Sequence, residues 1–263
     1  MTALSACIEV LFKAEYPDDF AARIRAAAAA GLDAVEFWKW RGKDLDSLER
    51  ALGDTGLPLV SFVSEPTGRL VDPATHETFL AGLRESLVIA KRLGARGLIV
   101  LSGDTLASDV PHAAQRTAVI KALQAAAPLA EAAGVTLLLE PLNTRKDHKG
   151  YFVDTTPEGF AIIEEVASGS VKLLYDLYHS AMMDENPAQV LRGYMPLVGH
   201  VHIADAPGRH EPGTGAIDWE ASLAVLVRER YTGAIGLEYW PTAATNGSLA
   251  SPQMAALKQV SER

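Results

Sequence analysis

The chain has 263 residues, of which 48% are apolar and 22% charged, so it can fill a large core and is not a disordered protein. No apolar run reaches the ~18 residues of a membrane-spanning helix, which argues against a membrane protein. The 33 acidic residues outnumber the 24 basic ones and give a net charge of −9. This balance argues against a general nucleic-acid binder, because such a protein needs a basic face.

The start of the chain lacks the basic segment and the cleavage site of a secretion signal. Its single cysteine, Cys7, can form no disulfide within the chain. A cytoplasmic protein is therefore the simplest expectation.

Short apolar runs alternate with longer helical patterns along the whole chain. Asp44 is the expected N-cap of the second helix and Thr156 that of the fifth, while Gly94 and Gly134 mark helix ends. We predict strands at 5–12, 34–38, 58–63, 97–101, 135–140, 171–175, 198–203 and 234–239. We predict helices at 17–30, 44–52, 73–93, 110–133, 156–167, 187–194, 218–228 and 252–260.

Continuous apolar strands that alternate with helices are typical of a parallel sheet covered by helices. Eight such units in 263 residues have the size of a (β/α)8 TIM barrel, so we predict an α/β fold with one domain over residues 1–263. The alternative is a doubly wound open sheet, which more often carries a glycine-rich phosphate turn after its first strand. The segment 12–15 after the first predicted strand has no glycine, which favours the barrel.

Four polar residues lie at the carboxyl ends of the last four predicted strands: Glu140, Asp176, His202 and Glu238. In a closed barrel these ends share one mouth, where active sites lie. Three carboxylates and an imidazole form a hard ligand set for Mn²⁺ or Mg²⁺, with Co²⁺ and Zn²⁺ as alternatives. Each residue taken alone is as readily explained as a strand cap or an ion-pair partner, but four at consecutive strand ends indicate a metal site.

Several sequence stretches resemble the xylose-isomerase-like barrels, and most closely the hydroxypyruvate isomerase family. They keep their order and spacing over nearly the whole second half of the chain, and the stretch at 30–37 (AGLDAVEF) also fits. The matching stretches are LLLEPLN (137–143), YDLYH (175–179), GHVHIAD (199–205), RHEPGTGAIDW (209–219) and GLEYWP (236–241).

The resemblance implies a role for each matching residue. Glu140, Asp176, His202 and Glu238 would bind a divalent metal, and the two glutamates would also be the catalytic proton-transfer pair. His179 and Arg209 would bind substrate oxygens. The implied activity is isomerisation of a small α-hydroxy carbonyl compound, such as hydroxypyruvate or tartronate semialdehyde, through a cis-enediolate. The resemblance also allows a homo-oligomer, because relatives commonly associate.

Three positions depart from the hydroxypyruvate isomerase or epimerase patterns and leave an alternative open. Many hydroxypyruvate isomerases have Gln where this chain has His202, whereas ketose 3-epimerases and inosose-type enzymes have His. The 3-epimerases commonly carry a Glu where this chain has Lys146, and the family's GTGE is GTGA here, with Ala216. A ketose 3-epimerase or an inosose-type isomerase or dehydratase on the same metal site is therefore the alternative.

Two other classes fit less well. A DNA-cleaving relative of the endonuclease IV type uses three zinc ions and many more histidines than the seven of this chain. A barrel that binds a sugar without turnover would not need the Glu140 and Glu238 pair.

Two segments after the second and fifth predicted strands are dense in positive charge: 38–43 (WKWRGK) and 145–149 (RKDHK). We expect Trp38, Lys39 and Lys146 to contact a small anionic substrate, a sugar acid or a keto acid, at the barrel mouth. The alternative is a pair of solvated loops. No nucleic-acid or membrane partner is expected.

Two further residues have open interpretations. His200 lies two residues before His202, so its side chain should point to the same face and lie deeper in the barrel. Glu36, near the end of the second predicted strand, is either a substrate contact or an ion-pair partner. His148 is expected to be a loop histidine on the surface.

Overall fold

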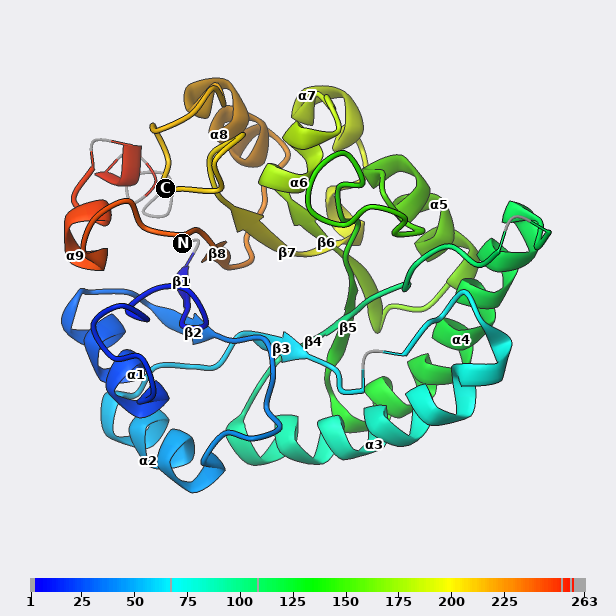
Figure 1. The fold of residues 1–263 in the computed structure, drawn as a ribbon, viewed down its shortest axis with the longest axis horizontal. Helices are drawn as coiled ribbons and strands as arrows, with labels where there is room; N and C mark the ends of the chain where they lie inside the picture. The colour runs from blue at the N-terminus through cyan, green and yellow to red at the C-terminus, as the bar shows by residue number, and fades with distance from the viewer. Residues whose placement is uncertain (1–2, 67, 108, 252, 256, 258–263) are drawn as a thin grey trace.

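Eight parallel strands form a central barrel with helices around it in the computed structural model, as Figure 1 shows. The structure describes residues 3–66, 68–107, 109–251, 253–255 and 257. The strand order is β2-β1-β8-β7-β6-β5-β4-β3. The strands are β1 (Leu4–Cys7), β2 (Ala34–Glu36), β3 (Ser61–Val63), β4 (Gly97–Val100), β5 (Thr136–Leu139), β6 (Val171–Asp176), β7 (Val198–Ile203) and β8 (Ile235–Leu237).

Backbone hydrogen bonds between β2 and the segment that leads into β3 close the ring. Val35 N donates to Pro58 O at 3.1 Å, and Val60 N donates to Val35 O at 2.8 Å. The predicted TIM barrel is therefore confirmed, and the open-sheet alternative is excluded.

The helices form the outer layer of the barrel. Asp44 accepts a hydrogen bond from Ser47 N at 3.1 Å and caps α2 as predicted, because its carboxylate satisfies a backbone donor that the first turn leaves free. Gly94 and Gly134 end α3 and α4 with φ near +70°, where a side chain would be strained. The helices are α1 (Phe20–Ala29), α2 (Leu45–Thr55), α3 (His76–Leu93), α4 (His112–Ala133), α5 (Thr156–Val166), α6 (Leu177–Met182), α7 (Pro187–Val190), α8 (Trp219–Arg228) and α9 (Thr245–Ser248), with 3-10 turns at Pro73–Thr75 and Met195–Leu197.

Several local predictions were wrong. No helix was predicted at Leu177–Met182, and the helix predicted at 187–194 ends at Val190. Two other errors involve side-chain contacts. The apolar run 8–12 does not continue β1 but turns, and the buried Arg23 guanidinium donates to the Ile8 carbonyl at 2.8 Å and so satisfies part of its backbone. Thr156 is the first residue of α5 rather than its cap, because its N–H and hydroxyl both donate to Glu185. The helix predicted at 252–260 falls partly outside the described residues.

Alternate residues along the central strands belong to two different apolar clusters. Leu98, Leu137, Leu139 and Leu173 belong to the large core, whereas Ile99, Leu138 and Leu174 form a small separate cluster. Leu138 lies inside the barrel, since its methyl groups lie where a side chain on Gly97 of β4 or Gly199 of β7 would begin. This inner layer fills the barrel below its mouth. Within the described residues, no helix is long and apolar enough to cross a membrane.

Candidate metal centre and substrate pocket

The four strand-end residues meet at the carboxyl end of the barrel. Asp176 is the last residue of β6, His202 lies in β7, and Glu140 and Glu238 directly follow β5 and β8. One ligand atom from each lies within 4.8 Å of the others, and all four side chains are buried. The parallel register that pairs Asp176 with His202 brings the neighbouring strand ends together.

The two glutamates of this cluster have different electrostatic surroundings. Burial, together with the charges of Glu238 and Asp176, raises the pKa of Glu140 to about 7. Burial also acts against ionisation of Glu238, but Arg209 and His202 outweigh it and hold the pKa of Glu238 well below its usual range. In the absence of a cation, the surroundings therefore favour the charged form of Glu238 more than that of Glu140.

The donor set fits a divalent cation. His202 Nδ1 lies 3.8 Å from Glu140 Oε1 and 3.4 Å from Glu238 Oε2, and neither ring nitrogen of His202 has a hydrogen-bond partner among the described residues. Three buried carboxylates around one imidazole repel one another, and a cation at their centre removes that repulsion.

Arg209 adds a fixed positive charge beside the cluster. Its guanidinium donates to Glu238 Oε2 and lies 3.4 Å from Asp176 Oδ2. Arg209 has φ +56°, an uncommon backbone conformation for a residue with a side chain. The buried Asp205 anchors its loop by accepting bonds from Gly213 N at 2.7 Å and from the Trp219 indole N–H at 2.8 Å. The GTG stretch of the sequence therefore supports the loop that presents Arg209.

His179 is a buried neutral donor at the same mouth. Asn143 N donates to its Nδ1 at 3.2 Å, so the ring proton lies on Nε2, which has no hydrogen-bond partner in the described part of the chain. Burial is the largest cause that lowers the pKa of His179, to about 4. His179 can therefore donate one hydrogen bond to a substrate oxygen.

A cavity of about 320 Å³ lies against these groups. Its lining combines charged and polar side chains with apolar ones. The lining residues are Trp38, Lys39, Val63, Ile99, Leu101, Glu140, Leu142, His148, His179, Arg209 and Glu238.

Trp38 joins the cavity wall to the cluster. Its indole N–H donates to Glu238 Oε1 at 2.5 Å, and its ring meets Trp240 edge-on with centroids 6.3 Å apart. Trp38 therefore holds one oxygen of Glu238 while Arg209 holds the other. The sequence predicted Trp38 only as a substrate contact.

The basic segments divide between the cavity and the outer surface. Lys39 lines the cavity, whereas Arg41 pairs with Glu85 and Arg145 with Asp184, both on the surface. The exposed Lys146 donates to the Pro207 carbonyl at 2.7 Å and is not among the lining residues, so its predicted substrate contact stays a prediction. His148 was expected on the surface but lines the cavity, half-buried, with its ring 5.4 Å from that of His179. One indication of this place is present in the sequence: His148 lies in the loop that follows β5, the strand that Glu140 directly follows.

The family model for the xylose isomerase-like TIM barrel matches residues 24–260. The chain belongs to the xylose isomerase-like TIM-barrel family.

Curated relatives within this family confirm the resemblance to hydroxypyruvate isomerases. The chain is 34% identical over 237 residues to the putative hydroxypyruvate isomerase of Homo sapiens, covering 84% of this chain and 83% of the relative. It is 33% identical over 237 residues to the 2-oxo-tetronate isomerase of Cupriavidus necator, covering 88% and 90%. It is 30% identical over 256 residues to the hydroxypyruvate isomerase of Escherichia coli, covering 95% and 97%.

Solved structures show the same barrel. A Brucella melitensis protein described as an AP endonuclease of family 2 superposes with a TM-score of 0.88 at 30% identity, covering 95% of this chain and 97% of that one. The 3-keto-D-glucoside 4-epimerase of E. coli superposes with a TM-score of 0.81 at 25% identity, covering 94% and 98%.

Proposed function

We propose that this protein is a divalent-metal-dependent isomerase of small α-hydroxy keto acids of the hydroxypyruvate or tartronate semialdehyde type. The observation that carries the proposal is the meeting of two glutamates, an aspartate and a histidine beside a cavity of about 320 Å³. That volume is at the small end of ligand pockets, which favours a short substrate. The relatives named as isomerases of hydroxypyruvate and 2-oxo-tetronate support the same class.

We infer that the four strand-end residues hold Mn²⁺ or Mg²⁺, with Co²⁺ or Zn²⁺ as alternatives. When bound there, such a cation polarises a substrate carbonyl and acidifies the neighbouring C–H bond.

The protein's own groups then move and place the proton. Glu140, whose carboxylate borders the cavity, removes a proton from the carbon next to the carbonyl and leaves an enediolate. Glu140 then returns this proton to the neighbouring carbon, and Glu238, which Trp38 and Arg209 hold as an anion, is the second carboxylate of the pair. His179 donates its Nε2–H to a substrate oxygen, and the apolar lining residues limit the access of water to the cavity.

Lys39 favours an acid over a neutral ketose as the substrate. Arg209 already forms ion pairs with Glu238 and Asp176. Lys39, which lines the cavity, forms no ion pair with a described carboxylate. A substrate carboxylate at the rim would pair with Lys39. We also propose a cytoplasmic location, because the one cysteine is buried and unpaired.

A ketose or keto-sugar epimerase is the second candidate. His202 in the ligand set and the similarity to the E. coli 4-epimerase favour it. The two reactions share the first proton removal and differ in the carbon, or the face of the carbon, to which the proton returns.

Deuterium exchange tests the proposal without a guess at the product. The protein is incubated with Mn²⁺ in D₂O and with hydroxypyruvate, tartronate semialdehyde, four-carbon keto acids, C4–C6 ketoses or inosose, and spectra are recorded after EDTA is added. We expect metal-dependent deuterium at the carbon next to the carbonyl, and an aldehyde product from the keto acid. Exchange with a configurational change and no carbonyl shift would establish the epimerase instead.

Glu140→Gln is the variant that tests the role of the proton carrier, because it keeps the shape of the side chain but cannot accept a proton. We expect its exchange to fall to background. Exchange at the wild-type rate in this variant would refute the assignment of Glu140.

A further inference from the structure

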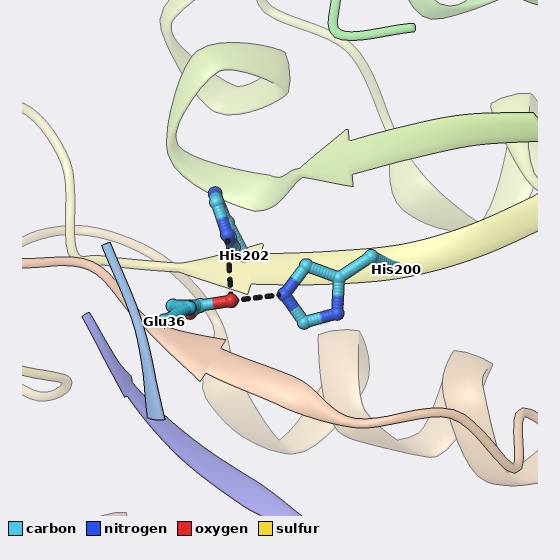
Figure 2. A group of neighbouring side chains, drawn as sticks. All are labelled: Glu36, His200 and His202. Atoms are coloured by element: carbon cyan, nitrogen blue, oxygen red, sulfur yellow. Dashed lines mark hydrogen bonds and ion pairs between the residues drawn. The ribbon is translucent and has the colours of Figure 1, made fainter. Parts of the chain in front are cut away.

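A buried carboxylate lies on the side of His202 that faces away from the other three strand-end residues. Glu36, the last residue of β2, lies between His200 and His202 of β7, as Figure 2 shows. Its Oε2 is 2.7 Å from His200 Nε2 and 3.4 Å from His202 Nε2. All three residues are at most 2% exposed, and Glu36 is not among the residues that line the substrate cavity.

The two nitrogens of the His202 ring face different carboxylates. Nδ1 faces Glu140 and Glu238, whereas Nε2 faces Glu36. In a neutral imidazole one nitrogen carries the proton and the other carries the lone pair that a metal needs. A carboxylate beside Nε2 stabilises the tautomer with its proton there and leaves the lone pair on Nδ1.

We propose that Glu36 is a positioning residue: its carboxylate, 3.4 Å from His202 Nε2, keeps the ring proton on that nitrogen and so leaves Nδ1 as the metal-ligating atom, while His200 holds Glu36 in place. This inference rests on the proposed function, which places a cation among the four strand-end residues. Metal-ligating histidines generally donate their other N–H to a carboxylate or carbonyl that orients the ring.

The packing around Glu36 is shaped to keep it in place. A Cβ added to Gly236 of β8 would lie 2.1 Å from Glu36 Oε1 and 2.6 Å from His202 Cδ2, so the contact requires glycine at this position. The Ser61 hydroxyl of β3 donates to Glu36 Oε2 at 3.3 Å. Three strands besides β2 therefore confine this carboxylate.

The competing interpretation is a second cation between Glu36, His200 and His202, whose ligand atoms lie within 4.8 Å of one another. Two ligands of a tetrahedral cation, each ~2.1 Å from it, lie about 3.4 Å apart. The 2.7 Å separation of Glu36 Oε2 and His200 Nε2 is instead that of a hydrogen bond.

The first test is the affinity for Mn²⁺, measured as free Mn²⁺ by electron paramagnetic resonance during titration. Glu36→Gln keeps the volume of the side chain but removes its charge, and we expect it to weaken binding about 10–100-fold. Glu65→Gln is the matched control, because Glu65 is also buried but accepts a hydrogen bond from Arg41 N at 2.9 Å and none from the four strand-end residues. The control should bind Mn²⁺ as the wild type does.

The second test uses the wild-type protein and does not depend on the folding of any variant. The ¹⁵N spectrum of histidine-labelled protein loaded with Zn²⁺ should show a metal-bound Nδ1 and a protonated Nε2 for His202. His202→Asn assigns the signals. A zinc-bound Nε2, or an Nε2 without a proton, would overturn the inference.

The outcomes separate this inference from the proposed function. Unchanged Mn²⁺ affinity in Glu36→Gln, with tight binding in the wild type, overturns the role of Glu36 and leaves the metal-dependent isomerase standing. Two bound ions in the wild type and one in Glu36→Gln would replace the positioning role by a second metal site. A wild-type protein that binds no divalent cation would overturn both proposals.

Discussion

The Trp38 indole N–H donates to Glu238 Oε1 at 2.5 Å, and the Trp38→Phe variant removes this donor while it keeps an aromatic ring beside Trp240. Glu238 Oε1 is then left with the Cys7 thiol at 3.9 Å, which is a weak donor. A hydrogen bond to a charged group contributes about 1.5–3 kcal/mol. The reaction that depends on the placement of Glu238 should therefore slow about 10–150-fold.

The assay is the initial rate of Mn²⁺-dependent deuterium exchange, with the metal site saturated. Trp40→Phe is the matched control, because its indole N–H donates to Ser86 Oγ at 3.1 Å and not to a strand-end residue. The control should exchange at the wild-type rate. Exchange by Trp38→Phe at the wild-type rate, in a folded protein that binds Mn²⁺, would refute the argument that this hydrogen bond places Glu238.

Three further predictions follow from the same site. In steady-state assays, Lys39→Gln should raise KM for an acid substrate about fivefold, because an exposed ion pair contributes about 1 kcal/mol. The control Arg41→Gln should leave KM unchanged, because the Arg41 guanidinium pairs with Glu85 on the surface. Mn²⁺ at 100 times its Kd should stabilise the metal-free protein by about 2.7 kcal/mol and raise Tm by about 5–10 °C in a thermal scan, and an equal amount of K⁺ should not. In EDTA, burial holds the pKa of Glu140 at about 7, above its unfolded value, so its contribution to stability is lost as the pH rises from 5 to 8. Glu140→Gln should lack this loss, and a constant Tm difference between the two proteins across that range would contradict the sign.

The barrel and the strand-end residues could be predicted because they depend on local patterns. Alternating apolar strands and helices favour a parallel barrel. The carboxyl ends of its strands lie at one mouth, whatever the conformation of the loops. The two-residue period of a strand also placed His200 on the same face as His202, and their rings lie 4.8 Å apart. The partner of both, Glu36, could not be assigned, because it comes from β2, which is not paired with β7 in the sheet.

Errors of prediction occurred where side chains from distant segments decide the local structure. The run 8–12 has the composition of a strand, but it turns where Arg23 of α1 binds the Ile8 carbonyl. The segment around His148 has the composition of a surface loop, but the fold places the His148 ring next to that of His179.

The sequence by itself determined which residues end the strands, and therefore which four side chains meet at the mouth. Only the tertiary structure decided which partner each charged side chain of the loops contacts. Lys39 lines the cavity, whereas Arg41, two residues later, pairs with Glu85 of α3. The tertiary structure also decided which nitrogen of His202 faces the other strand-end residues. The physical reason is that strand position fixes the direction of a side chain, whereas its partners are set by whatever charges and donors the closed barrel places within a few ångströms.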